Sequence, residues 1–217
     1  MNKDRVASFS DGVFAIVITL LVLEVRLPEV PYGGLRQSLV TLLPSIGAYV
    51  LSFLLVGMYW VFHHHAFTLL DAVDGVLLWL NIVFLLFISF MPFPTMMLGR
   101  YPFQVLPVVF YGLNLLLANV NGLAMVLYLH RHPHLASRRL TPAVYRTQVR
   151  MYLGINGLYI VNIAVAFVVP ALSIALFAAL ALFLMYRSAA LMGIGRCRPA
   201  FAEEAESGRL DADATGV

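Results

Sequence analysis

The sequence predicts an all-α integral membrane protein with six transmembrane helices in each subunit. Of its 217 residues, 61% are hydrophobic and 12% are charged, whereas a soluble domain has roughly 45–50% apolar and about 25% charged residues. The apolar residues also gather in long runs that are separated by short polar gaps. A globule of this size cannot bury so many apolar side chains, so lipid must cover them.

Six apolar runs come close to the about 20 residues that a helix needs to cross a bilayer. They extend approximately over 6–25, 39–62, 76–98, 103–129, 151–168 and 171–186. In the third run, Pro92 and Pro94 predict a kink or loosening of its outer half. The fifth and sixth runs meet at Pro170, and we favour a tight hairpin there over one kinked helix, because the joined run is far too long for a single span. Residues 1–190 are therefore predicted to form one transmembrane domain, and the acidic segment 191–217 is predicted to be a disordered cytoplasmic tail.

The basic residues predict the orientation. With six spans, both chain ends lie on one side, and that side collects eleven of the fourteen Lys and Arg residues. The other side collects only Arg26, Arg36 and Arg100. Because cytoplasmic loops are enriched in Lys and Arg, we expect a multi-pass protein of the cell (inner) membrane with both termini in the cytoplasm. The basic residues do not form a continuous patch, so nucleic acid is not expected as a partner.

The first predicted helix carries the most informative polar residues. At about 100° per residue, Phe9, Gly12, Ile16, Leu20 and Leu23 share one stripe, with Arg5 below them and Thr19 at its edge. Asp11 lies on roughly the opposite side, and Ser10 lies between. A carboxylate at the centre of a membrane helix costs about 2.5–3.5 kcal/mol on insertion scales, so Asp11 should not face lipid. We expect a hydrogen-bond network with a structural role around Asp11 and Ser10, which we call the polar knot. The more specific alternative is a proton or ion site at Asp11.

The second and third helices offer partners for this knot. His63, His64 and His65 end the second helix, where Trp60 also lies, and Asn81 lies near the same end of the third. We expect at least one histidine to hydrogen-bond to Asp11 or Ser10. Three consecutive histidines point in three directions on a helix, so they cannot all bind one ion, and no metal site is predicted. Further asparagines at 114, 119, 121, 156 and 162 are expected to form interhelical hydrogen bonds, with a translocation path as the alternative.

Three motifs resemble the prokaryotic members of the transmembrane protein 175 family. The first is Arg5-x-x-x-Phe9-Ser10-Asp11 followed by Gly-Val-Phe-Ala-Ile and Thr-Leu-Leu-Val-Leu-Glu. The others are Tyr59-Trp60-x-x-His63-His64 in the second helix and Ser89-Phe-Met-Pro92-Phe-Pro94 in the third. The resemblance is close over the first three helices and extends to the last three by length and number.

This resemblance implies a potassium-permeable cation channel. A chain with one six-helix repeat would form a homotetramer whose four first helices line a central pore. The narrow hydrophobic constriction would fall on Ile16, with further apolar layers on Leu20 and Leu23 and a hydroxyl at Thr19. Arg5, Phe9, Ser10 and Asp11 would hold this pore helix through contacts with Trp60, His63 or His64 and Asn81. Like the family, the sequence lacks a Thr-Val-Gly-Tyr-Gly-like filter loop.

Other function classes stay open at this point. A proton-coupled secondary transporter could use Asp11 and a histidine, although such proteins usually have repeats and a midplane site. A membrane enzyme would need a nucleophile beside its base, and the sequence offers no clear one. A scaffold protein would carry no ion flux. We expect a non-enzymatic channel without a cofactor, whose partners are further copies of itself, membrane lipid and monovalent cations, with K⁺ as the permeant ion.

Overall fold

The computed structural model describes residues 2–26 and 39–194, with side chains to residue 188. Within these ranges it contains six helical segments that are long and apolar enough to cross a membrane, which confirms the predicted fold class. The helices are α1 (Lys3–Leu20), η1 (Leu21–Glu24), α3 (Leu43–Thr68), α4 (Gly75–Ser89), α5 (Pro92–Arg100), α6 (Val105–Arg131), η2 (Pro133–Leu135), α7 (Pro142–Ala166) and α8 (Pro170–Ile194). The predicted tail beyond residue 194 and Arg36 lie outside the described residues.

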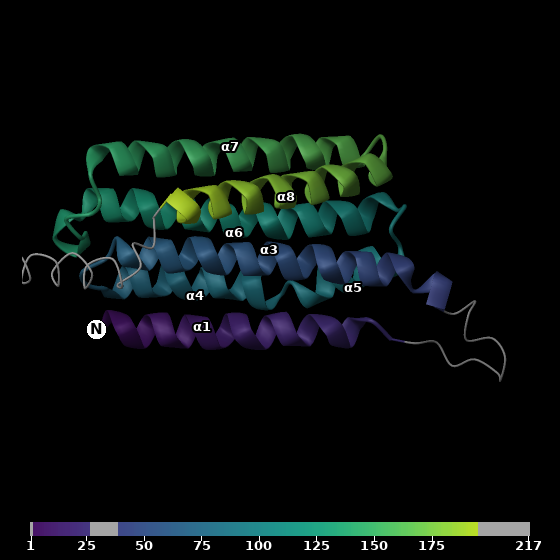
Figure 1. Cartoon of the computed structure of the whole chain (residues 1–217), viewed down its shortest axis with the longest axis horizontal. Helices are drawn as coiled ribbons and strands as arrows, with labels where there is room; N and C mark the ends of the chain where they lie inside the picture. Colours follow the sequence, from purple (N-terminus) through teal and green to yellow (C-terminus); the bar gives the residue numbers. More distant parts are fainter. Residues whose placement is uncertain (1, 27–38, 195–217) are drawn as a thin grey trace, which may run out of the picture. The chain divides into compact units, whose positions relative to one another are not determined.

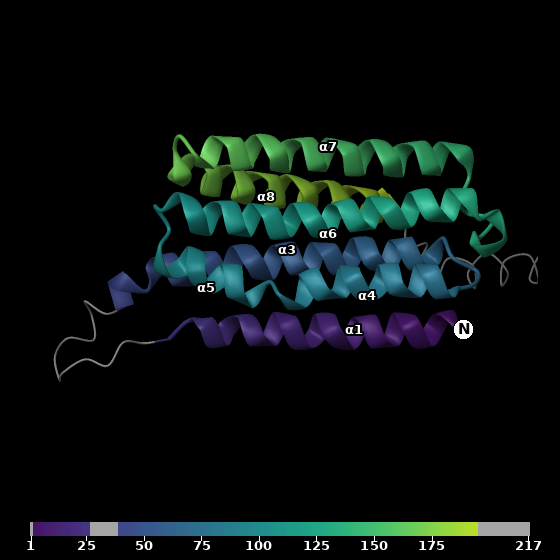
Figure 2. The same ribbon diagram turned by 180° about the vertical axis from the view of Figure 1, so that it is seen from behind.

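The chain divides into two compact units, Met1–Ala181 and Leu182–Val217, and the site described below lies within the first. In this unit α1 lies along one edge and packs against α3 and α4. Figures 1 and 2 show α6 and α7 on the far side of α3 and α4 from α1. One flank of α1 is therefore covered by the other helices of this unit, and the rest of its surface is left open by the described part of the chain.

The third membrane span is broken at its prolines, as predicted. Helix α4 ends at Ser89 and α5 begins at Pro92, and a proline nitrogen has no proton to donate to the preceding turn. Polar side chains occupy the break: the hydroxyl of Thr95 contacts the Met91 carbonyl at 2.8 Å and donates to Ser52 Oγ at 2.7 Å. Side-chain hydrogen bonding of this kind is what makes a proline break tolerable in a membrane.

The connection between the last two spans is the tight hairpin that the sequence predicts. Helix α7 ends at Ala166 and α8 begins at Pro170. The hydroxyl of Ser173 donates to the Asn162 carbonyl at 3.1 Å and joins the two helices. Helix α7 begins earlier than expected, at Pro142 instead of near residue 151, because Thr141 caps it and proline suits a first helical turn. The sequence prediction left out residues 142–150 because the arginines in this segment interrupt the apolar run.

Backbone hydrogen bonds join the two loops at the end where α1 begins. Leu70 and Ala136 form an isolated antiparallel bridge, and the Ser137 amide donates to the Leu69 carbonyl at 2.8 Å. The ammonium of Lys3 donates to the Leu70 carbonyl at 2.9 Å, so the start of α1 is attached to the same structure. The N-terminus and the α3–α4 and α6–α7 loops therefore form one layer.

Candidate functional site

Helix α1 has one buried and one exposed face. The buried residues recur at helical spacing and pack against α3 and α4; they are Val6, Ser10, Phe14, Val17 and Leu21. On the exposed face, Ile16 is 60% exposed, Leu20 42% and Leu23 57%. The stripe predicted from the sequence therefore belongs to the part of α1 that the described residues leave uncovered.

A change of helix type at the end of α1 keeps this stripe aligned. Leu20 is the last α-helical residue, and Leu21–Glu24 form a 3₁₀-helix. Residues three apart eclipse one another in a 3₁₀-helix, so Leu23 stays in line with Leu20. The Thr19 hydroxyl, also exposed, donates to the Ile16 carbonyl at 2.8 Å. No pattern in the sequence predicted this tightening of the last turn.

A chain of buried polar groups connects α1 to α4 and α3. The Ser10 hydroxyl donates to the Val6 carbonyl at 2.9 Å and accepts from Asn81 Nδ2 at 3.0 Å. Asn81 Oδ1 lies 2.8 Å from His63 Nε2. An amide oxygen can only accept, so Nε2 carries the proton of this bond. With Ser10 fully buried, Asn81 1% exposed and His63 5% exposed, the chain satisfies groups that would otherwise be costly in an apolar bundle.

Aromatic rings surround the buried end of this chain. The His63 ring stacks on Phe84 with 5.5 Å between centroids and an interplanar angle of 12°. Phe67 lies 4.5 Å and Phe14 lies 5.6 Å from it. These phenylalanines fix the orientation of the imidazole, and sequence reasoning missed them because an aromatic residue in a membrane helix carries no distinctive signal.

Asp11 bonds to Trp60, one of the contacts that the family resemblance implies, and not to a histidine. Its Oδ1 accepts from the indole Nε1 of Trp60 at 2.8 Å in an exposed contact. No hydrogen bond joins Asp11 to Ser10 or to a histidine within the described chain, and His63 reaches Ser10 only through Asn81. The expected single knot is therefore two separate contacts, because successive residues on a helix diverge by about 100°.

The other motif residues that were expected to hold the first helix lie at the surface. Arg5 and His64 are exposed, and Phe9 is 61% exposed. The His64 ring contacts Trp60 at a centroid distance of 5.9 Å. No group of three His, Cys, Asp or Glu side chains that could hold a metal ion occurs in the ranges that the structure describes.

Two of the predicted asparagine contacts join helices. Asn119 Nδ2 donates to Asn156 Oδ1 at 2.9 Å and connects α6 to α7. Asn114 Nδ2 donates to the Phe87 carbonyl at 3.0 Å and connects α6 to α4. The side-chain oxygens of Asn121 and Asn162 are buried and have no hydrogen-bond partner among the described residues.

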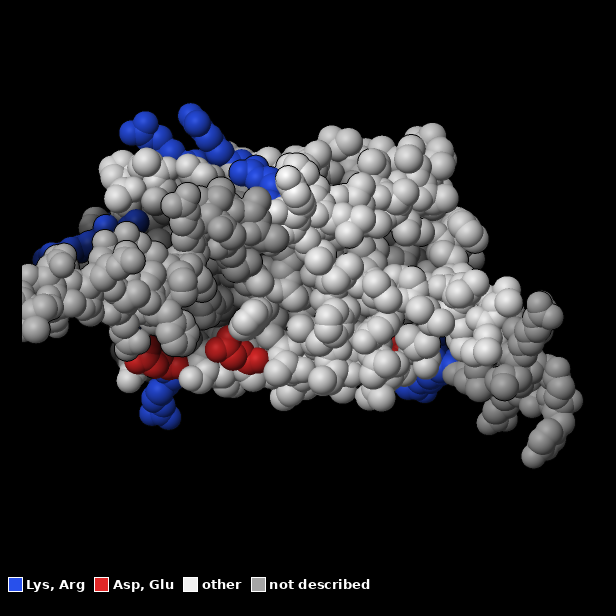
Figure 3. All heavy atoms as spheres, viewed as in Figure 1, with Lys and Arg blue, Asp and Glu red and all other residues white. Residues whose placement is uncertain are grey.

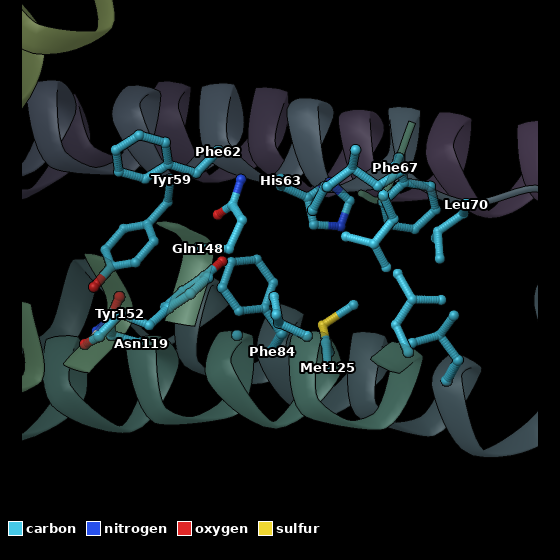
Figure 4. Close-up of a pocket in the computed structure, with 17 residues that line it drawn as sticks. Tyr59, Phe62, His63, Phe67, Leu70, Phe84, Asn119, Met125, Gln148 and Tyr152 are labelled. Atoms are coloured by element: carbon cyan, nitrogen blue, oxygen red, sulfur yellow. Dashed lines mark hydrogen bonds between the residues drawn. The ribbon is translucent and has the colours of Figure 1, made fainter. Parts of the chain in front are cut away.

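A small cavity lies between α3, α4, α6 and α7, away from α1. Its volume is about 40 Å³, which is enough for a few water molecules at about 10–15 Å³ each. Its lining is mostly apolar, and Figure 4 shows His63 and Gln148 among the polar side chains that border it. A second hollow, lined by Arg5, Val6, Phe9, Leu78 and Ile82, lies between α1 and α4. The first is too small for an ion path, so the exposed face of α1 is the stronger candidate site.

Comparisons with known proteins find relatives that match most of the chain. The family described as endosomal/lysosomal potassium channel TMEM175 matches residues 5–92. A potassium channel of Streptomyces collinus is 38% identical over an alignment of 190 residues, and the match covers 84% of this chain and 92% of that protein. A potassium channel of a Chryseobacterium species is 36% identical over 84% of this chain and 92% of its own length. The crystal structure of a lysosomal potassium-selective channel TMEM175 homolog from Chamaesiphon minutus superposes with a TM-score of 0.76 at 31% identity, covering 86% of this chain and 97% of that one.

Proposed function

The chain belongs to the TMEM175 family, and from this premise we propose that it is a potassium-permeable cation channel. The relatives that match nearly their whole length are named potassium channels. No catalytic step is part of the proposal, because a channel does its work by providing a path and a barrier.

The pore in this proposal forms where the first helices of four identical chains meet around a central axis. The observation that carries it is the exposed row of Ile16, Leu20 and Leu23 on the edge helix of the bundle. A ring of four isoleucines would form the constriction, with the leucines as further apolar layers. Apolar rings of this kind can close a pore by dewetting.

The polar contacts of α1 support this arrangement. A pore helix must keep a fixed rotation, or its apolar ring would turn away from the axis. The Ser10–Asn81–His63 chain fixes one flank of α1, and the Asp11–Trp60 contact fixes another. These residues therefore act by positioning the helix and are not proposed to touch the ion.

Ion discrimination would be moderate in such a pore. Without a ring of fixed carbonyl ligands, potassium is favoured mainly because it loses its hydration shell at lower cost than sodium. The protein would lie in the cell (inner) membrane with both termini in the cytoplasm, which is supported by the distribution of eleven basic residues on one side against three on the other.

The direct test is ion flux into liposomes that contain the purified protein. A potassium gradient should drive flux that exceeds the sodium flux several-fold, without obligatory proton movement. Equal fluxes of the two ions would refute potassium preference. Flux in a strict stoichiometric ratio to protons would instead support the proton-coupled transporter. Crosslinking in the bilayer should give a tetramer, and a chain that stays monomeric would refute the shared pore.

A further inference from the structure

The first part of α7 and the loop before it carry a cluster of positive charge. Together with Arg131, the last residue of α6, this short segment contains five exposed arginines: Arg131, Arg138, Arg139, Arg146 and Arg150. The sequence contains no Asp or Glu between residues 75 and 202. The described carboxylates nearest to this loop are Asp71 and Asp74 in the α3–α4 loop, and Asp74 is already bound by the Tyr128 hydroxyl, so the arginines on α7 have no carboxylate on their own helix. Figure 3 shows Lys and Arg side chains over the first turns of α7 without Asp or Glu beside them. This corner would therefore attract an anion.

Two of these arginines lie on one face of α7. Arg146 and Arg150 are four residues apart, which places them next to each other on a helix surface. The same face continues with apolar residues, where Leu153 is 55%, Ile160 57% and Val161 58% exposed. A pair of guanidinium groups thus lies directly above a strip of exposed apolar surface.

Two glycines make this strip shallow. Gly154 and Gly157 are exposed, and a Cβ atom added at either would meet no atom within 4 Å. The missing side chains leave room along the helix between the larger residues. An extended hydrocarbon chain lying along α7 would find contact surface there while its polar end reached the arginines.

We propose that this face of α7 binds an anionic phospholipid, with its phosphate at Arg146 and Arg150 and an acyl chain along Leu153, Gly157 and Ile160. Guanidinium groups bind phosphate oxygens in a bidentate manner, and basic clusters at the end of a membrane helix are typical of anionic headgroup recognition. The enrichment of cytoplasmic loops in arginine accounts for positive charge in the loop. It does not account for two arginines placed within the helix in line with an open apolar strip. This inference does not depend on which ion the protein conducts.

The test is native mass spectrometry of the purified full-length protein released from micelles with added lipid. Phosphatidylglycerol and phosphatidylcholine with identical acyl chains are the probes. We expect phosphatidylglycerol to be retained preferentially, and the double variant R146Q/R150Q to reduce that retention about tenfold. The control is R100Q, which removes an exposed arginine at the end of α5 and should leave retention unchanged. Unchanged circular dichroism of the double variant would show that it is folded.

Several results would overturn the proposal. Equal retention of the two lipids, or equal loss in R100Q and in R146Q/R150Q, would show that the site is not specific. Displacement of the lipid by millimolar inorganic phosphate would identify a site for free phosphate instead. If a chain ending at residue 202 retains lipid but the full-length chain does not, the acidic residues 203–213 occupy the arginines, and the site is an intramolecular contact.

Discussion

The indole Nε1 of Trp60 donates to Oδ1 of Asp11 across 2.8 Å and joins α3 to α1. This contact lies in an exposed position, whereas the second connection of α1, from Ser10 through Asn81 to His63, is buried. Helix α1 is thus held on two sides, on one side by an exposed hydrogen bond and on the other by a buried chain of hydrogen bonds. The buried connection should contribute more to the free energy of unfolding than the exposed one. A charged hydrogen bond at the surface is screened, whereas breaking a buried hydrogen bond leaves unsatisfied polar groups.

Replacing Trp60 by Phe should lower stability by about 1 kcal/mol, because it removes the donor to a carboxylate at a partly exposed site. The loss should appear as a lower melting temperature in detergent and as less tetramer after crosslinking. The matched control is Trp79→Phe on α4, since Trp79 is 66% exposed and makes no indole hydrogen bond within the described chain.

A double-mutant cycle tests whether Asp11 and Trp60 act through each other. Adding Asp11→Ala to W60F should lower stability little further; fully additive losses would show that the two side chains act independently. An Asp11→Ala protein that assembles normally but loses only selectivity would contradict a positioning role.

Replacing Asn81 by Leu should have a larger effect, about 2–4 kcal/mol, because it leaves Ser10 and His63 buried without their partner. Thermal unfolding in detergent measures this, and altered ion flux would report a rotated α1. Ser89→Ala on the same helix is the control, since its hydroxyl is exposed and bonds only its own helix, at the Leu86 carbonyl. Equal melting temperatures for N81L and S89A would rule out a structural role for the buried chain.

Replacing Ile16 by Asn should wet the proposed constriction and raise the leak of potassium several-fold, because a polar ring no longer excludes water. The measurement is potassium flux into liposomes without any applied stimulus. Leu106→Asn offers a control at another apolar residue of similar exposure, 63% against 60%, but on α6. If both variants leak equally or neither does, Ile16 does not form the gate.

The sequence predicted the parts of this structure that depend on local chemistry. Apolar length identified six spans, proline located the break before α5, and hydrophobic spacing found the exposed stripe of α1. The start of α7 was missed because arginines interrupt the hydropathy run that marks a span. Trp60 as a partner of Asp11 came from the family resemblance and not from the residue pattern, because the pattern of one helix gives the direction of a side chain but not the rotation of the neighbouring helix. The phenylalanines around His63 depend on packing among α1, α3 and α4, which no single segment encodes.

Replacing Gly99 by Ala should destabilise the fold by about 1–3 kcal/mol, because the new Cβ would lie 2.9 Å from the Cα of Ser45 and 3.0 Å from its Oγ. A backbone atom cannot rotate away as a flexible side chain can, so α3 and α5 would have to separate. Gly154→Ala is the control, since its new Cβ would meet open space. The melting temperatures of the two variants should differ clearly, and equal values would mean that the close approach of α3 and α5 is not required.

Asp74 gives a prediction about pH outside the membrane spans. It caps α4 by accepting from the Leu77 amide at 2.8 Å, and it accepts from the Tyr128 hydroxyl at 2.6 Å. Partial burial by itself would raise the pKa of Asp74, but these two hydrogen bonds, together with His132 and His134 nearby, outweigh it and hold the pKa below its usual value. A carboxyl group with a depressed pKa contributes stability that is fully present above its unfolded pKa, about 3.9, and is lost as the pH falls through the folded pKa.

Asp74→Ala should therefore lower stability by about 1–3 kcal/mol at pH 7, through the lost cap and the lost bond to Tyr128. The difference from the original protein should be fully present at pH 5 and should shrink below about pH 4, where the original carboxyl group also becomes protonated. Melting temperatures across this range measure it. Asp71 is exposed and lies three residues before Asp74. Asp71→Ala removes the same charge, and it should show neither the loss of stability nor its pH dependence. A difference that persists undiminished to pH 2 would mean that Asp74 acts through the space it fills, and that its charge is irrelevant to the cap.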